Sequence, residues 1–253
     1  MSTNAKIIGH RGASFDAPEN TVAAVRLAWE RGADAVEVDA RLSRDGRAVL
    51  MHDGNVRRTT GVDADVADLT YADLRALNAG AWKDARWSGE RIPTLGEALS
   101  LTPAGRQLMV EIKCGPEIID PLTETVEAWA GRPEELVFAG FSDETMARVK
   151  AALPAHRVYL ISRTRTEDGS PAAGAATFVE RARAAGLDGL SLSACDEIDA
   201  AFARQVHEAG LPLVVWTVDD PALAGQMVEA GVDAIATNRP GWLRDQLREI
   251  VSA

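Results

Sequence analysis

Short apolar runs alternate with longer stretches of helical periodicity along most of the chain. The runs are too short for helices and too continuous for strands with one exposed face, a pattern that is typical of buried parallel strands. Eight strands are predicted: Lys6–His10, Ala35–Asp39, Leu108–Ile112, Leu136–Phe141, Val158–Ile161, Gly189–Leu192, Leu213–Thr217 and Ala234–Thr237. Between them, helices are predicted near residues 19–31, 94–100, 117–130, 143–152, 171–185, 197–209, 220–230 and 241–251.

A recurring unit links these elements: the end of a helix, a glycine, an apolar residue, an aspartate and the next apolar run. Residues 30–39, 185–193 and 230–238 are copies of this unit. The glycines suit the left-handed position that closes a helix; they are Gly32, Gly186 and Gly231. Residues that cap or begin helices mark several helix starts; they are Asn20 or Thr21, Asp143, and Asp220 followed by Pro221.

Eight βα units in 253 residues predict an α/β fold of the (β/α)₈, or TIM barrel, type, built as one domain over residues 1–253. A doubly wound open sheet is the alternative, but no glycine-rich dinucleotide motif follows the first strand.

The segment after the second predicted strand departs from the alternation of strands and helices. Asp45-Gly46 is a strong hairpin signal, so Ala48–His52 is expected to fold back antiparallel on the second strand. Residues 40–92 are interpreted as a hairpin and insertion at the barrel mouth, where insertions shape sites.

Composition narrows the function further. The net charge of −11 argues against binding to nucleic acids or to anionic membranes, because both need basic surfaces. No apolar run approaches the roughly 20 residues of a membrane span, so no stable membrane insertion is expected. The N-terminus has no apolar core of a secretory signal, which predicts a cytoplasmic protein. The two cysteines, Cys114 and Cys195, are expected to be reduced, buried thiols.

Chemically active side chains gather at the predicted strand ends, on the face where barrels carry their active sites. Glu37 and Asp39 are two positions apart on one strand and point to the same face. Glu111 lies at the end of the next strand of the barrel. Three carboxylates at one mouth would repel unless a cation joins them, and oxygen ligands in that number suit Mg²⁺ or Ca²⁺.

Each feature by itself has an ordinary structural explanation. A single carboxylate at a strand end is more often a cap or an ion-pair partner than a ligand, and Trp216 could be core packing. His156, in the turn before a strand, and His207, in the last turn of a helix, are interpreted as structural. Their occurrence together is stronger evidence for an active site, because two of the four histidines and one of the four lysines fall at strand ends together with an arginine and three acids.

Eight motifs occur in order along the chain. They are His-Arg-Gly (10–12), Pro-Glu-Asn-Thr (18–21), Glu-x-Asp (37–39), His-Asp (52–53), Arg-Thr-Thr (58–60), Ile-Pro-Thr-Leu (92–95), Glu-Ile-Lys (111–113) and Trp-Thr-Val (216–218). This pattern resembles the glycerophosphodiester phosphodiesterase family over nearly the whole chain. The resemblance implies a TIM barrel of lipid and glycerol metabolism, a phosphoric diester hydrolase. It also implies that a divalent metal assists hydrolysis of glycerophosphodiesters to sn-glycerol 3-phosphate and an alcohol.

Roles follow from the resemblance, position by position. Glu37, Asp39 and Glu111 look like ligands of one divalent cation, Mg²⁺ or Ca²⁺. The implied roles of the other residues are general acid–base catalysis by His10 and His52, a phosphate clamp formed by Arg11 and Lys113, and a substrate pocket walled by Trp216 and Phe141. Gly12 is expected to let the backbone approach the phosphate. The chain departs from the family pattern at Gly54, where a second Asp is frequent, and at Gly140, where Ser is frequent.

Three other functions fit the sequence less well than hydrolysis of glycerophosphodiesters. A glycosidase would need its two acids to flank a bond, whereas Glu37 and Asp39 share one strand, and it would leave the two histidines without a role. A phosphosugar isomerase or aldolase would bind phosphate at the last two strands, where the expected glycine-rich loops are missing. A non-catalytic binder of glycerophosphodiesters is expected to lack a histidine or a metal acid, and none is lacking. The sequence leaves open the headgroup, the metal, the oligomeric state, the attacking nucleophile and which histidine is the acid.

Overall fold

Eight parallel strands close into a barrel in the computed structural model, which describes residues 5–252. The strands follow the order β1-β9-β8-β7-β6-β5-β4-β2, and pairing of β1 with β2 closes the ring. Their bounds are β1 Lys6–Gly9, β2 Ala35–Leu42, β4 Gln107–Ile112, β5 Leu136–Gly140, β6 Arg157–Ser162, β7 Gly189–Ser193, β8 Leu213–Trp216 and β9 Ala234–Thr237. The predicted TIM barrel is thereby confirmed, and the open sheet is excluded by the β1–β2 pairing.

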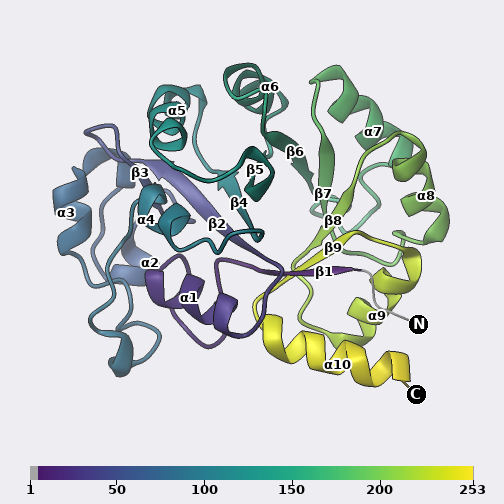
Figure 1. Cartoon of the computed structure of the whole chain (residues 1–253), viewed down its shortest axis with the longest axis horizontal. Coiled ribbons are helices and arrows are strands. Elements are labelled where there is room, and N and C mark those ends of the chain that lie inside the picture. The colour runs from purple at the N-terminus through teal and green to yellow at the C-terminus, as the bar shows by residue number, and fades with distance from the viewer. Residues whose placement is uncertain (1–4, 253) are drawn as a thin grey trace.

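Helices surround the barrel and connect successive parallel strands (Figure 1). The connecting helices are α1 Val22–Glu30, α4 Leu95–Ser100, α5 Ile119–Glu127, α6 Asp143–Ala152, α7 Ala175–Ala184, α8 Ala200–Glu208 and α9 Pro221–Ala230, and α10 Pro240–Ser252 follows the last strand. Short 3₁₀ turns precede α5 and β5, at η3 Pro116–Ile118 and η4 Pro133–Glu135. None of these helices, nor any other within the described residues, combines the length and apolar character that a bilayer crossing requires.

The hairpin after β2 also forms as predicted. Strand β3, Ala48–Leu50, pairs antiparallel with β2, and Gly46 has a φ of 78° at the turn. The insertion that follows contains α2 Arg57–Thr60, η1 Val66–Asp68, α3 Tyr71–Ala76 and η2 Ala85–Trp87. None of these short elements was predicted, since they have three to six residues and the segment carries no helical period of its own. A small apolar cluster that includes Val49, Leu74 and Ile92 holds the insertion against β3.

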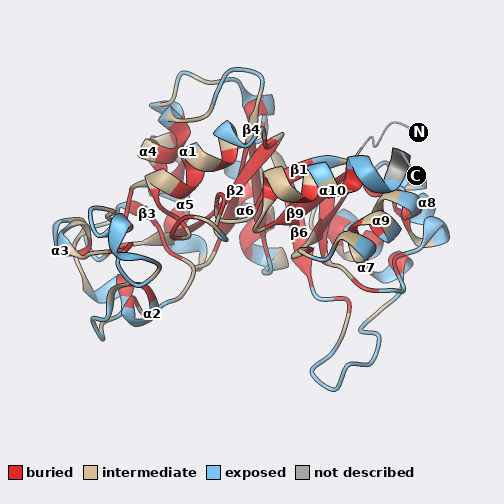
Figure 2. Ribbon diagram, turned by 90° about the horizontal axis from the view of Figure 1, so that it is seen from below, coloured by how far each residue is buried: buried red, intermediate tan, exposed pale blue. Residues whose placement is uncertain are grey.

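Alternating residues of the strands face two different cores. Side chains such as Val36, Val38 and Leu108 pack outward under the helices, in the larger cluster. Ile8, Met109 and other side chains fill the barrel interior. Figure 2 shows the result, with buried strands at the centre and exposed surfaces on the outer helices and loops. Because β2 alternates in this way, Glu37 and Asp39 point inward with Ala35, toward the axis of the barrel.

Most of the predicted helix boundaries rest on the expected residues. Thr21 and Asp220 accept hydrogen bonds as N-caps of α1 and α9, and Pro221 begins α9. Left-handed φ values of 77°, 67° and 90° follow helix ends at Gly32, Gly186 and Gly231. The assignment of Asp143 as a cap is wrong, because the Ser142 hydroxyl accepts from Thr145 N and Asp143 is already the first helical residue.

Candidate active site

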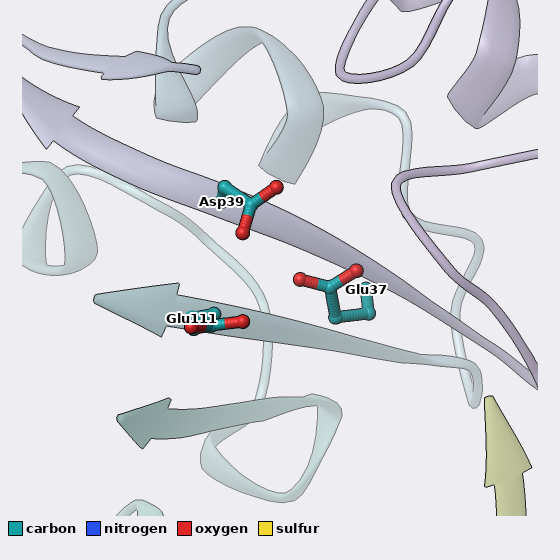
Figure 3. Close-up of side chains that lie close together, drawn as sticks. All are labelled: Glu37, Asp39 and Glu111. Carbon is teal, nitrogen blue, oxygen red and sulfur yellow. The ribbon is translucent and has the colours of Figure 1, made fainter. Parts of the chain in front are cut away.

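Three buried carboxylates project from β2 and its neighbour β4 toward the same space (Figure 3). Parallel pairing places Asp39 beside Glu111, and Glu37 lies one inward position before Asp39 on β2. Each residue offers an oxygen, and these oxygens lie within 4.8 Å of one another. The register of two strands therefore brings together the three acids predicted as ligands.

The acidic cluster is electrostatically costly without further cations. Burial, and then the charges of the other acids, raise the pKa of Glu37 well above its ordinary value, and the same causes raise the pKa of Glu111. Oε1 of Glu37 and Oδ1 of Asp39 are buried and lack a hydrogen-bond donor. Buried acceptors normally have a partner, and a cation held among the three acids would supply one to both oxygens.

Two cations lie against the cluster. The Arg11 backbone N–H donates to Glu37 Oε2 at 2.8 Å, and its Nε lies 3.2 Å from Asp39 Oδ2. Nζ of Lys113, which follows β4 directly, lies 2.6 Å from Glu111 Oε1 and 3.4 Å from Asp39 Oδ1. Arg11 and Lys113 thus reach the same acids from two sides of the barrel mouth.

His10 follows β1 directly and is held in one orientation. Its Nδ1 lies 2.8 Å from Asn238 Oδ1, while Asn238 Nδ2 donates to Asp219 Oδ2 at 2.5 Å. Because Asp219 can only accept, Asn238 must turn its carbonyl oxygen to His10, and Nδ1 of His10 carries the proton. Nε2 of the neutral ring is then the basic atom. Burial, helped by the charge of Arg11, lowers the pKa of His10.

His52 is held in a similar way at the end of the hairpin. Its Nδ1 lies 2.7 Å from Asp53 Oδ1, which leaves Nε2 as the basic atom of the neutral ring. Burial lowers the pKa of His52 as well. The Arg41 guanidinium donates to the carbonyl oxygens of His52 and Lys113, and so fixes the ends of the hairpin and of β4 relative to each other.

An ion-pair series joins His52 to the acidic cluster. Arg58 Nε donates to Asp53 at 2.6 Å, and its two other nitrogens donate to both oxygens of Glu19 at 2.8 Å. Glu19 also accepts from Arg11 at 2.9 Å. Burial alone would raise the pKa of Glu19, but the hydrogen bonds and charges of Arg58 and Arg11 outweigh burial and lower it to about 2. The same kind of bond from Arg58 lowers the pKa of Asp53 to about 2.

Trp216 and Phe141 form one wall of the mouth. Their ring centroids are 5.9 Å apart with an interplanar angle of 80°, and Trp216 Nε1 donates to Ser191 O. Phe141 remains 42% exposed, and Lys113 Nζ lies 5.8 Å from its ring centroid. The structure therefore brings together every residue that the sequence pattern assigned to the site.

Some contributors were missed or misinterpreted from sequence. Asn20 was considered only as a helix cap, yet it exchanges hydrogen bonds with Asp39: Nδ2 donates to Oδ2 at 2.7 Å, and Asp39 N donates to Oδ1 at 3.0 Å. For Arg58 the sequence shows only its place in the Arg-Thr-Thr motif. Gly12 has a structural reason beside the expected approach to a phosphate, since a Cβ there would lie 2.5 Å from the carbonyl carbon of Ala24 and its missing side chain makes room for α1. For Asn20 and Arg58, the only signal in the sequence is their position in the Pro-Glu-Asn-Thr and Arg-Thr-Thr motifs.

The remaining histidines and the cysteines play no part in the cluster. His156 precedes β6, at the opposite end of the barrel, and its ring packs at a tilt against Phe138. His207 contacts Asp233 on the outer surface. Both cysteines are free thiols, and burial raises the pKa of Cys114 to about 11. Their thiols are therefore protonated at neutral pH and are poor nucleophiles.

Comparison with known proteins decides the family. Residues 10–242 match the model of the glycerophosphoryl diester phosphodiesterase family. The chain belongs to this family. A glycerophosphodiester phosphodiesterase from Caldanaerobacter subterraneus subsp. tengcongensis is 32% identical over 248 residues, which span 96% of this chain and 98% of that protein.

Solved structures agree with the family assignment. A phosphodiesterase from Oleispira antarctica, in complex with the product sn-glycerol-3-phosphate, is similar with a TM-score of 0.85, at 28% identity over 96% of both chains. A glycerophosphodiester phosphodiesterase from Agrobacterium tumefaciens gives a TM-score of 0.80, at 26% identity over 95% of this chain and 99% of that one. The predicted enzyme class, a phosphodiesterase of glycerophosphodiesters, is confirmed, and the glycosidase and isomerase alternatives are set aside.

Proposed function

We propose that the chain hydrolyses glycerophosphodiesters to sn-glycerol 3-phosphate and an alcohol, with one divalent cation held by Glu37, Asp39 and Glu111. The observation that supports this most directly is the cluster of three ligand oxygens within 4.8 Å, two of whose acids keep a buried oxygen without a donor. Hard oxygen donors of this kind suit Mg²⁺ or Ca²⁺. Bound there, the cation would supply Lewis-acid stabilisation of the negative charge that develops on the phosphoryl oxygens.

Charge balance favours the same arrangement. Three carboxylates against Arg11 and Lys113 leave one net negative charge, which would repel a phosphodiester anion. Within this set of five groups, a divalent cation changes the balance to one net positive charge, which attracts a phosphodiester. The chain thus creates a local site for an anion although its net charge is −11.

Arg11 and Lys113 are the residues that we assign to the phosphate. The Arg11 guanidinium is already aligned by Glu19 and Asp39, so little conformational entropy remains to be lost when it binds an oxygen pair. The Lys113 ammonium acts as a point charge on the other side. Trp216 and Phe141 are assigned to the glycerol part, against which their apolar surfaces can pack.

His10 and His52 are assigned to proton transfer. Asn238 and Asp53 hold Nδ1 of each ring, so Nε2 is the atom that exchanges a proton. One ring takes the proton of the attacking oxygen, and the other gives a proton to the departing alcohol. The negative charge of the bound phosphodiester favours protonation of the acid, against the effect of burial on its pKa.

Coupled detection of sn-glycerol 3-phosphate tests the assignment. Wild-type protein is compared with His10→Ala and His52→Ala, using glycerophosphocholine and glycerophosphoglycerol. Each histidine contributes about 10²–10⁴-fold to the rate, and the variants are expected to lose that much. His207→Ala, which alters an exposed ring outside the mouth, is the matched control. Wild-type rates in both mouth variants would refute the acid–base pair, and an inactive wild type that still binds these diesters would identify a non-catalytic binder.

A further inference from the structure

Aromatic rings and cations that the proposed hydrolysis does not use form a cluster on the rim of the barrel mouth. This rim cluster consists of Phe15 in the loop after β1, Trp82 and Lys83 in the insertion, and Arg239 after β9. Phe15 is 52% exposed and Trp82 is 40% exposed. Lys83 Nζ lies 5.9 Å from the ring centroid of Phe15 and 5.7 Å from that of Trp82, and Arg239 Cζ lies 4.2 Å from that of Phe15.

The rim cluster shares its backbone framework with His10. Lys83 Nζ donates to the carbonyl oxygen of Ser14 at 2.7 Å. Ser14 Oγ lies 2.7 Å from Asn238 Oδ1, the same oxygen that accepts from His10. The backbone N–H of Phe15 donates to Asn238 O at 3.0 Å. The rim cluster is therefore adjacent to the reacting centre.

Its two cations have no carboxylate partner. Among the described residues, neither Lys83 nor Arg239 forms an ion pair, although acids outnumber bases by 38 to 27 in this chain. The Arg239 guanidinium is stacked between Phe15 and Trp242, with Cζ 3.8 Å from the Trp242 ring centroid. Stacking covers the faces of the guanidinium, while the N–H groups in its plane make no hydrogen bond to any described residue. Both cations are therefore available to bind an anion.

Different strands of the barrel carry the wall formed by Trp216 and Phe141 and the rim cluster. Phe141 and Trp216 stand at the ends of β5 and β8, and the rim cluster rises from β1, β9 and the insertion after β2. Arg11, which is assigned to the phosphate, follows β1 and faces the acids of β2 and β4. If the glycerol packs on Trp216 and Phe141 as proposed, the rim cluster is the part of the mouth that is left for the other ester arm of the phosphate.

We propose that the rim cluster is the subsite for the alcohol part of the substrate and that it favours glycerophosphodiesters whose alcohol carries a further anionic group, such as a second phosphodiester or a carboxylate. This inference rests on the proposed function. Lys83 and Arg239 bind the additional anion, and the exposed rings of Phe15 and Trp82 pack against the carbon chain that bears it. The same cations disfavour a cationic alcohol such as choline.

Three substrates test this subsite: bis(glycerophospho)glycerol, whose alcohol carries a second phosphodiester, glycerophosphoglycerol, whose alcohol is neutral, and glycerophosphocholine. The measured quantity is the ratio of kcat/KM between the first and the second, corrected for the two equivalent scissile bonds of the first. A ratio is used because Lys83 also holds Ser14, and a shift of that loop would change all rates together. Two partly exposed ion pairs predict a wild-type ratio of about tenfold, with glycerophosphocholine the poorest substrate of the three.

Lys83→Met and Arg239→Met, which keep the apolar stem and remove the charge, are each expected to lower the ratio by about threefold, and the double variant to bring it close to one. High salt is expected to lower the wild-type ratio in the same direction. Matched controls are Lys6→Met, at the opposite end of the barrel, and Arg148→Met on the surface of α6. A wild-type ratio near one, or a ratio that survives in both rim variants, would overturn the subsite. Failure of the wild type to hydrolyse all three substrates would overturn the proposed function itself.

Discussion

Substitution of Asn20 gives a sharp test of how the site is held. Asn20 is 3% exposed, and Asp39, with which it exchanges two hydrogen bonds, is completely buried. Its backbone has a φ of 56°, and its N–H donates to the carbonyl oxygen of Arg11 at 3.1 Å. Asn20→Ala would remove both side-chain bonds and place a Cβ-bearing residue without a local hydrogen bond in the left-handed region.

The magnitude follows from these contacts. The bond to the Asp39 carboxylate is charge-assisted and contributes about 1.5–3 kcal/mol, and the bond from the Asp39 amide about 1 kcal/mol. Left-handed strain adds about 1 kcal/mol for alanine. We expect Asn20→Ala to lower the free energy of unfolding by about 3.5–5 kcal/mol, a large part of an ordinary domain's stability of roughly 5–15 kcal/mol. Asn20→Gly avoids the strain and should be less destabilised, by about 1 kcal/mol.

Urea unfolding and kcat/KM for glycerophosphoglycerol measure the two consequences. Loss of a residue that orients a metal ligand typically costs about 10–100-fold in metal affinity or activity, and both variants should show it. Asn55→Ala, in the exposed part of the insertion, is the control and should change stability by less than about 1 kcal/mol. If the free energy of unfolding of Asn20→Ala lies within 1 kcal/mol of the wild-type value and its activity is unchanged, the orientation of Asp39 does not depend on Asn20 and the reasoning is wrong.

Further predictions concern the ion pairs, the metal and the packing around the site. Arg58→Ala should lower kcat/KM by about 10–100-fold, whereas Arg57→Ala, its exposed neighbour, should have little effect; equal losses would argue against a positioning role for Arg58. The Glu19 carboxylate has a pKa of about 2 in the folded protein and an ordinary value near 4.5 when unfolded. The ionised Glu19 therefore contributes about 3 kcal/mol to the free energy of unfolding above pH 4.5, and this contribution is lost as the pH falls toward 2. In Glu19→Gln the free energy of unfolding should fall less steeply with pH in that window. An unchanged dependence on pH would contradict the lowered pKa of Glu19. A chelator should abolish turnover and lower the melting temperature, because the clustered carboxylates lose their common cation; full turnover of glycerophosphocholine in excess chelator would exclude the metal. Gly12→Ala should destabilise far more than Gly61→Ala, measured by urea unfolding, because both glycines have a positive φ but only Gly12 is packed against Ala24; similar losses would assign the effect to φ alone.

The barrel could be predicted from the sequence because its signals are local. Short apolar runs, glycines after helix ends and Asp45-Gly46 each act over a few residues, and the strand period alone places Glu37 and Asp39 on one face. Strand ends at the same mouth then follow from parallel pairing, which is why the acids, His10, Arg11 and Lys113 could be assigned to one site before their distances were known. His52 joins them through the Asp45-Gly46 hairpin and the family motif.

Contacts between distant segments were decided only by the tertiary structure. The register that sets Asp39 beside Glu111, the bonds from Asn20 to Asp39 and the Arg58 bridge to Glu19 depend on how strands and loops meet in space. No local pattern shows which atoms will lie within 3 Å of each other. Gly12 is a clear example, since its sequence position indicates nothing about α1, whereas in the structure the approach of α1 leaves no room for a side chain there. Local periodicity thus determined which elements form and which faces they bury, and packing determined the partners that hold each side chain of the site in place.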